Sequence, residues 1–189
     1  QTVAALGARA AWLLQVFPEL TDAASHMPQS LASASTFYNA VSALHSHNVE
    51  LARKLVCQVR RLEDSRVSTL VAESYERAYS AIVSQQQLSE LEEIATVMES
   101  PTSSQSEANL LRLWEVRMEA MSQDSIELQG TLTNHILVFQ PDRELKMWLR
   151  FARLCATSGR HESTERVFSR LLNGRGIISA IRSDIPPCV

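Results

Sequence analysis

Apolar residues recur at every third or fourth position over most of the chain, which is the spacing of one face of an α-helix. The clearest case is the set Phe37, Ala40, Val41 and Leu44, which predicts a helix over Ser35–His47. The same spacing predicts further helices over Leu51–Leu62, Val67–Ile82, Leu88–Met98, Leu110–Met118, Ile126–Val138, Leu145–Cys155 and Thr164–Leu172. Because no Gly or Pro occurs from Gln29 to Ser100, that stretch contains no residue that breaks a helix for geometric reasons.

The predicted helices are arranged as consecutive pairs. We expect antiparallel hairpins at residues 35–64, 67–99, 106–138 and 142–172, whose starts lie 32, 39 and 36 residues apart. That period is close to the roughly 34 residues of a tetratricopeptide repeat. The fold class predicted is therefore all-α, a tetratricopeptide-like solenoid, with a partial preceding repeat and connector at 1–34 and a flexible connector at 173–189.

Helix ends are also marked in the sequence. Gly159 is placed to stop a helix in the left-handed conformation. The pairs Ser89 with Glu92, Ser104 with Glu107 and Asp124 with Glu127 have the spacing of a capping box, and they predict helix starts or reinforcements.

Composition narrows the classes of function. The 189 residues carry a net charge of −3 and intermix acidic with basic residues, so the chain lacks the extended basic surface that binding to a nucleic-acid backbone needs. Three distant cysteines form neither a disulfide framework nor a zinc motif, which favours a reducing compartment. The longest clean apolar run near the start, Ala10–Leu14, is too short for a membrane span. Because the chain opens at Gln1 rather than Met, we expect it to be a piece of a larger protein.

The sequence gives only weak support for catalytic or metal-binding residues. His45 and His47 point about 200° apart on a helix, which disfavours shared metal ligation. The acidic group Glu90, Glu92 and Glu93 is better explained as compensation of a helix dipole than as paired carboxylates for acid–base catalysis. We therefore predict no catalytic, cofactor-binding or metal-binding residue, while a helical hydrolase that uses Glu90–Glu93 and a histidine stays as an alternative. The aromatic residues on the stripes are expected in the core: Trp12, Tyr75, Tyr79, Trp114 and Trp148.

One basic stripe on a predicted helix is a candidate binding surface. Lys146, Arg150 and Arg153 recur at i, i+4 and i+7 and could bind a polyanion between repeats. A solvated basic face explains the same pattern and is favoured.

Several segments resemble a known family. Ala72–Val83, followed by Leu88–Ile94, closely resembles the FAT region of target-of-rapamycin (TOR) serine/threonine kinases, members of the phosphatidylinositol 3-kinase-related group. Thr36–His45 is similar to the preceding helix of that region. Met147–Cys155, with Ser158–Arg160, is similar to a later one. The resemblance covers roughly Phe37–Leu172.

The resemblance implies a non-catalytic scaffold in TOR signalling. In that family the FAT solenoid clamps the kinase domain of the same chain and contacts other subunits of the TOR complex. ATP and magnesium are then expected only in the kinase domain of the parent. Some members hold an inositol polyphosphate in a basic pocket of the solenoid, near whose position Lys146 falls. A cytoplasmic location follows, with recruitment to endomembranes through partners. The alternative to a kinase segment is a free-standing tetratricopeptide adaptor.

Overall fold

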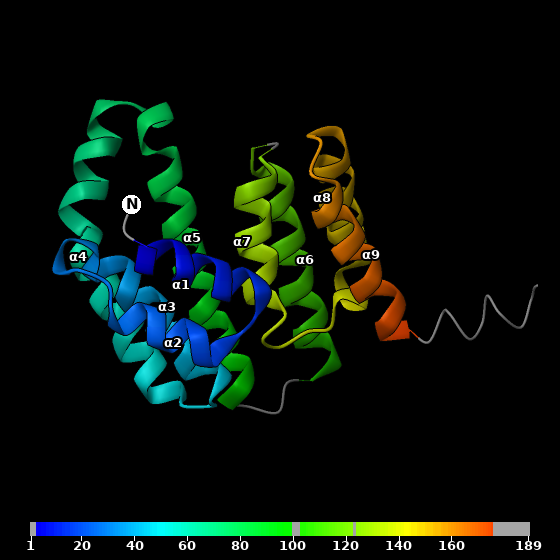
Figure 1. The fold of residues 1–189 in the computed structure, drawn as a ribbon, viewed down its shortest axis with the longest axis horizontal. Helices are drawn as coiled ribbons and strands as arrows, with labels where there is room; N and C mark the ends of the chain where they lie inside the picture. Colours follow the sequence, from blue (N-terminus) through cyan, green and yellow to red (C-terminus); the bar gives the residue numbers. More distant parts are fainter. Residues whose placement is uncertain (1–2, 100–102, 123, 176–189) are drawn as a thin grey trace, which may run out of the picture. The chain divides into compact units, whose positions relative to one another are not determined.

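The computed structural model describes residues 3–99, 103–122 and 124–175, and all regular structure in these ranges is helical (Figure 1). This confirms the predicted all-α class and its packing of consecutive helices. The helices are α1 (Val3–Leu14), α2 (Phe17–Ser25), α3 (Ala32–His45), α4 (Val49–Glu73), α5 (Tyr75–Glu99), α6 (Ser104–Ala120), α7 (Ser125–His135), α8 (Leu145–Thr157) and α9 (His161–Arg175). Two short 3-10 helices, η1 (Gln29–Leu31) and η2 (Pro141–Glu144), precede α3 and α8.

The chain forms two compact units. Among the described residues, unit 1 comprises 3–99 and 133–138, and unit 2 comprises 103–122, 124–132 and 139–175. In unit 1, α1 packs on α2, α2 on α3, α3 on α4 and α4 on α5. In unit 2, α8 packs on α9, and η2 contacts both. In these pairs, neighbours in sequence are therefore neighbours in space, as in a helical repeat.

The core of each unit consists of the inner stripes of its helices. Unit 1 buries the α3 residues Ala40, Val41 and Leu44 together with Leu88, Leu91 and Ile94 of α5. Unit 2 buries Trp114, Met118, Trp148, Phe151 and Cys155. The predicted core positions of Trp12, Trp114 and Trp148 are confirmed, because each ring is almost fully removed from solvent.

The predicted boundaries in the middle of unit 1 are wrong. The expected helices Leu51–Leu62 and Val67–Ile82 are instead parts of α4 and α5, which meet at Ser74. The polar residues between Leu62 and Val67 do not end a helix, because none of them removes a backbone N–H or forces an unusual φ. Ser74 adopts an extended conformation (φ −168°, ψ 152°), and its Oγ accepts from the Arg77 N–H at 3.3 Å.

Two further corrections follow from this geometry. The hairpin limits at 35–64 and 67–99 change, since α4 packs on both α3 and α5. Tyr75 is not a core residue: 71% of its surface is exposed, and Tyr79 is only half-buried. Most residues at the end of α4 and the start of α5 are exposed, because a single helix pair cannot bury a full apolar face.

The predicted helix ends have mixed outcomes. Gly159 has φ +72° and follows α8, which confirms its role as a left-handed stop. Asp124 caps α7 by accepting from Ile126 N–H at 2.7 Å, whereas α6 is capped by Ser103, one residue before the predicted Ser104. Ser89 lies inside α5 and caps nothing. Helix α7 ends at His135 rather than Val138, and α9 runs to Arg175, past the predicted end at Leu172. Residues 176–189 of the predicted connector lie outside the described residues, and the division at 1–34 stays a prediction.

Candidate functional site

The basic stripe of α8 lies against α6 in unit 2. Lys146 Nζ donates to Glu115 Oε1 at 2.6 Å and to Glu119 Oε1 at 2.7 Å. These two hydrogen bonds raise the pKa of Lys146 above its usual range, and the bond from Lys146 lowers the pKa of Glu119. The ammonium group is therefore charged and already neutralised by two carboxylates.

The other two members of the stripe differ from each other. The Arg150 guanidinium donates at 2.7 Å to the Met118 carbonyl in the last turn of α6, which also accepts from the Met121 N–H. Arg153 is exposed. A polyanion would have to displace Glu115 and Glu119 from Lys146 and Met118 from Arg150. Binding of a polyanion at this stripe stays a prediction, and the observed contacts explain the stripe as a helix-packing surface.

A charged pocket of about 530 Å³ lies beside this stripe. Its walls come from α6 and from the segment 142–147, and they include Arg112, Glu115, Arg143 and Lys146. Arg143 is itself paired with Glu107 at 3.0 Å. Cationic side chains and carboxylates are therefore mixed in the walls of the pocket. No excess of one sign of charge is present that would favour a ligand of the opposite sign.

Helix α5 carries the acidic group Glu90, Glu92 and Glu93, and it directs Glu90 and Glu92 to different partners. Glu90 is fully buried, and its Oε2 lies 3.5 Å from His135 Nε2, while Oε1 accepts from Gln86 Nε2 at 3.0 Å. Glu92 points elsewhere and pairs with Arg60 at 2.9 Å. A carboxylate does therefore meet a histidine, but both side chains have 0% exposure, so no substrate reaches them. This burial opposes the hydrolase alternative.

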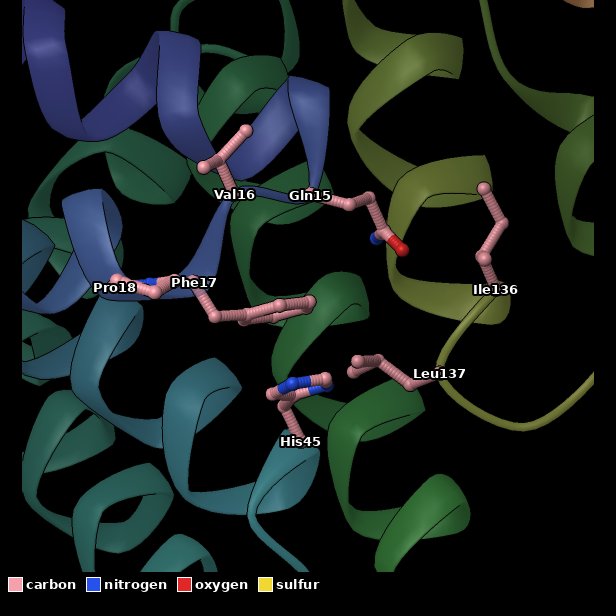
Figure 2. A pocket seen from close by; sticks show the side chains of 7 residues that line it. All are labelled: Gln15, Val16, Phe17, Pro18, His45, Ile136 and Leu137. Carbon is pink, nitrogen blue, oxygen red and sulfur yellow. The ribbon is translucent and has the colours of Figure 1, made fainter.

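A second pocket, of about 500 Å³, lies in unit 1 (Figure 2). It is lined by Gln15, Val16, Phe17, Pro18, His45, Ile136 and Leu137. Figure 2 shows the Phe17 ring flat against the His45 ring, and the two centroids are 3.5 Å apart with the planes 4° from parallel. Leu137 points toward these rings from the segment after α7. The walls are largely apolar, so the pocket suits recognition of an apolar side chain rather than a proton transfer.

Polar contacts fix the segments around this pocket. Gln15 has φ 62°, a left-handed conformation that ends α1, and its Nε2 donates to the Thr133 carbonyl at 2.8 Å. Trp12 Nε1 donates to Asn134 Oδ1 at 3.0 Å within the core. The last turn of α7 is thereby tied to α1. The sequence does not predict this pocket. Ile136 and Leu137 fit the apolar stripe of the predicted helix 126–138, and His45 fits a solvent-exposed position at the end of a helix.

Within the part of the chain that the structure describes, no three or more His, Cys, Asp or Glu side chains are grouped so as to hold a metal ion. Nor does any helix of these ranges combine the length and apolarity of a membrane-spanning segment.

Comparisons with known proteins place the chain in a family. The FAT domain profile matches residues 4–186, nearly the whole chain. Serine/threonine-protein kinase TOR2 of Saccharomyces cerevisiae is 32% identical over 172 residues, which are 91% of this chain and 7% of that protein. Serine/threonine-protein kinase mTor of Drosophila melanogaster is 31% identical over 167 residues, 88% of this chain and 7% of its own length. Serine/threonine-protein kinase TOR of Oryza sativa is 34% identical over 145 residues, 75% of this chain and 6% of its own length.

The match has the extent and identity that a shared family requires. It covers both units, and it includes Ala72–Val83 and Met147–Cys155, the segments that resemble this family in sequence. The chain spans only about 7% of the length of the first two of these relatives. It therefore belongs to the FAT domain family, and its relatives there are TOR serine/threonine kinases.

Proposed function

We propose that this chain is a non-catalytic scaffold segment of a TOR-like serine/threonine kinase, which supports the kinase domain of the same polypeptide and contacts other subunits of its complex. The observation that carries the proposal is the FAT domain match over residues 4–186. ATP and magnesium would be bound by the kinase domain, and the parent would act in the cytoplasm.

The arrangement of helices supports a mechanical role. From α1 to α5, and again from α8 to α9, each helix packs on its neighbour in sequence, so displacement of one helix is resisted by the close-packed side chains of the next. The core side chains are large and fully buried, with Trp114 and Met118 in unit 2 and Leu44 and Leu91 in unit 1. Packing of this kind transmits force between neighbouring helices without requiring an active centre.

The proposal is tested in the full-length parent by two neighbouring residues of α8. Trp148 is 3% exposed and Leu149 is 44% exposed, so only the first is a core residue. Trp148→Ala is expected to destabilise unit 2 by about 3–5 kcal/mol and to lower kinase activity or complex assembly. Since no ATP contact changes, the KM for ATP should stay near that of the wild type.

Leu149→Ala is the matched control and should leave activity close to the wild-type value. The scaffold role is refuted if Trp148→Ala demonstrably loosens α8 and α9, measured by amide hydrogen exchange, while kinase activity and subunit composition stay at wild-type levels.

A free-standing adaptor is the competing function. Sequencing the parent transcript beyond Val189 separates the two hypotheses. A glycine-rich loop, a catalytic-loop Asp and a metal-binding Asp of the kinase pattern would support the scaffold proposal. A stop codon before any such pattern would support the adaptor.

Polyanion binding by Lys146, Arg150 and Arg153 is a separate proposal for the same chain. The hydrogen bonds from Lys146 to Glu115 and Glu119 oppose it, because a bound inositol polyphosphate would compete with two local carboxylates for the same ammonium.

A further inference from the structure

The pocket of about 530 Å³ that α6 and the segment 142–147 form in unit 2 carries charges of both signs. Its walls include three cations and three carboxylates: Arg112, Arg143, Lys146, Glu115, Asp142 and Glu144. Apolar side chains complete the lining, among them Leu111 and Leu145. A pocket of this composition suits a small ligand that has an apolar body and charged groups of both signs.

Arg112 is a cation of this pocket that the chain itself leaves unpaired. It is exposed on α6 and forms no hydrogen bond or ion pair with any of the described residues. Lys146 pairs with two carboxylates of α6, and Arg143 pairs with Glu107. A guanidinium presents a planar fork of N–H donors that matches the two oxygens of a carboxylate. Arg112 is therefore the group to which a ligand carboxylate would bind.

The second wall of the pocket carries negative charge. Asp142 is half-buried and Glu144 is 7% exposed, and both belong to η2, whereas Arg112 belongs to α6. These carboxylates repel a simple anion or a polyanion that approaches Arg112, and they attract a cation. A carboxylate accepts several hydrogen bonds, so Asp142 can bind an ammonium in addition to the contact that it already makes within the chain. The two walls together favour a ligand that brings a carboxylate to α6 and an ammonium to η2.

We propose that this pocket binds a small zwitterion in which an apolar body separates a carboxylate from an ammonium. The carboxylate pairs with Arg112, the ammonium pairs with Asp142, and the apolar body lies on Leu111 and Leu145. An ω-amino acid is the simplest member of this chemical class. The proposal goes beyond the scaffold function and does not depend on it, because the site needs only residues of unit 2.

The test compares four small molecules by saturation-transfer difference NMR, which observes the ligand and is therefore applicable to the full-length parent. 6-Aminohexanoate has one charge at each end, hexanoate has only the carboxylate, and hexylamine has only the ammonium. 6-Aminohexanoate is expected to bind, and the two analogues with one charge should bind at least about tenfold more weakly, since each lacks one charge-assisted contact. Norleucine is an isomer of 6-aminohexanoate with both charges at one end. It should also bind more weakly, because it cannot reach both walls.

Substitutions of Arg112 test its assigned contact. Arg112→Gln is expected to weaken the binding of 6-aminohexanoate at least about tenfold, because the charge-assisted contact to the carboxylate is lost. Arg112→Lys should give an intermediate affinity, because lysine keeps the charge but lacks the planar fork. Arg61→Gln is the matched control. Arg61 is exposed on α4 and likewise forms no ion pair with the described residues, so this variant should bind 6-aminohexanoate as the wild type does.

Asp142→Asn distinguishes a binding role from a structural one. Loss of this negative charge is expected to weaken the binding of 6-aminohexanoate and to strengthen the binding of hexanoate, because the wall then no longer repels a lone carboxylate. A variant that only loosened η2 would weaken the binding of both molecules, and that result would contradict the assignment of Asp142.

The proposal is overturned if 6-aminohexanoate does not bind to the wild-type parent, or if Arg112→Gln binds it as tightly as the wild type does. Hexanoate or norleucine binding as tightly as 6-aminohexanoate would overturn it as well. None of these results bears on the scaffold role, which the kinase activity of the Trp148→Ala variant tests separately.

Discussion

At the scale of single residues, the buried pair Glu90 and His135 is the least ordinary feature of the chain. Both side chains are completely buried, and they join α5 to the last turn of α7 within unit 1. Gln86 donates to Glu90, and Trp12 holds the neighbouring Asn134. A buried carboxylate costs desolvation energy, so the group is tolerated only where partners are close. The pair therefore specifies how the end of α7 docks more than it adds to overall stability.

The Glu90–His135 pair yields a double-mutant prediction. Glu90→Leu or His135→Leu alone should each destabilise the chain by about 3–5 kcal/mol, because the remaining polar group loses its partner inside the core. The double variant is expected to be much less destabilised than the sum of the two. Denaturant unfolding of the four proteins gives the coupling energy, and strictly additive losses would show that the two side chains do not interact.

The carboxylates on Lys146 yield a prediction about anion binding. Glu115→Gln with Glu119→Gln removes both competitors of a polyanion, and binding of inositol hexakisphosphate, measured by isothermal titration calorimetry, should become tighter than in the wild type. Lys146→Ala in the same background serves as the control and should abolish the gain. Equal affinity in all three proteins would exclude Lys146 from any such site.

At the scale of elements, helix ends depend on single residues in the left-handed conformation. Gly159 ends α8 with φ +72°, and a Cβ placed there would meet nothing within 4 Å. His47, at φ 57°, has the same role after α3, where Asn48 N–H donates to the Ala43 carbonyl at 2.8 Å. A substitution at Gly159 therefore measures the free-energy cost of the left-handed backbone conformation alone, because the added side chain meets no steric clash.

Opposite substitutions at these two ends should shift stability in opposite directions. Gly159→Ala is expected to cost about 1 kcal/mol, and His47→Gly to gain up to about 1 kcal/mol, because glycine alone adopts this conformation without strain. Thermal unfolding measures both. Gln15→Gly is an informative comparison, since the same relief at φ 62° is offset by the lost hydrogen bond to Thr133. A gain in stability from Gly159→Ala would contradict the assignment.

At the scale of the whole molecule, the chain consists of two compact units, each with its own core of packed helices. In such repeats the stability of a helix depends mostly on its neighbours. A core truncation should therefore loosen the local helices most. Leu44→Ala is expected to cost about 2–5 kcal/mol and to speed amide exchange in α2–α5 more than in α8 and α9.

The reciprocal variant is Phe151→Ala, which removes a buried ring of α8. In this variant, the rate of amide hydrogen exchange should rise most in α8 and α9. Uniform acceleration across the chain in both variants would instead show that all described helices unfold as one cooperative unit.

Residue order alone is enough to predict the helical class, the inner stripes such as Ala40–Leu44, the stop at Gly159 and the resemblance to the FAT region. Each of these depends on residue spacing or on the conformational freedom of one residue, and both are local properties. The folded arrangement is needed to show that α4 and α5 meet at Ser74, that Tyr75 is exposed while Glu90 and His135 are buried, and that carboxylates of α6 bind Lys146. Those outcomes depend on which distant side chains lie nearby, and burial and charge pairing are set by neighbours in space rather than along the chain.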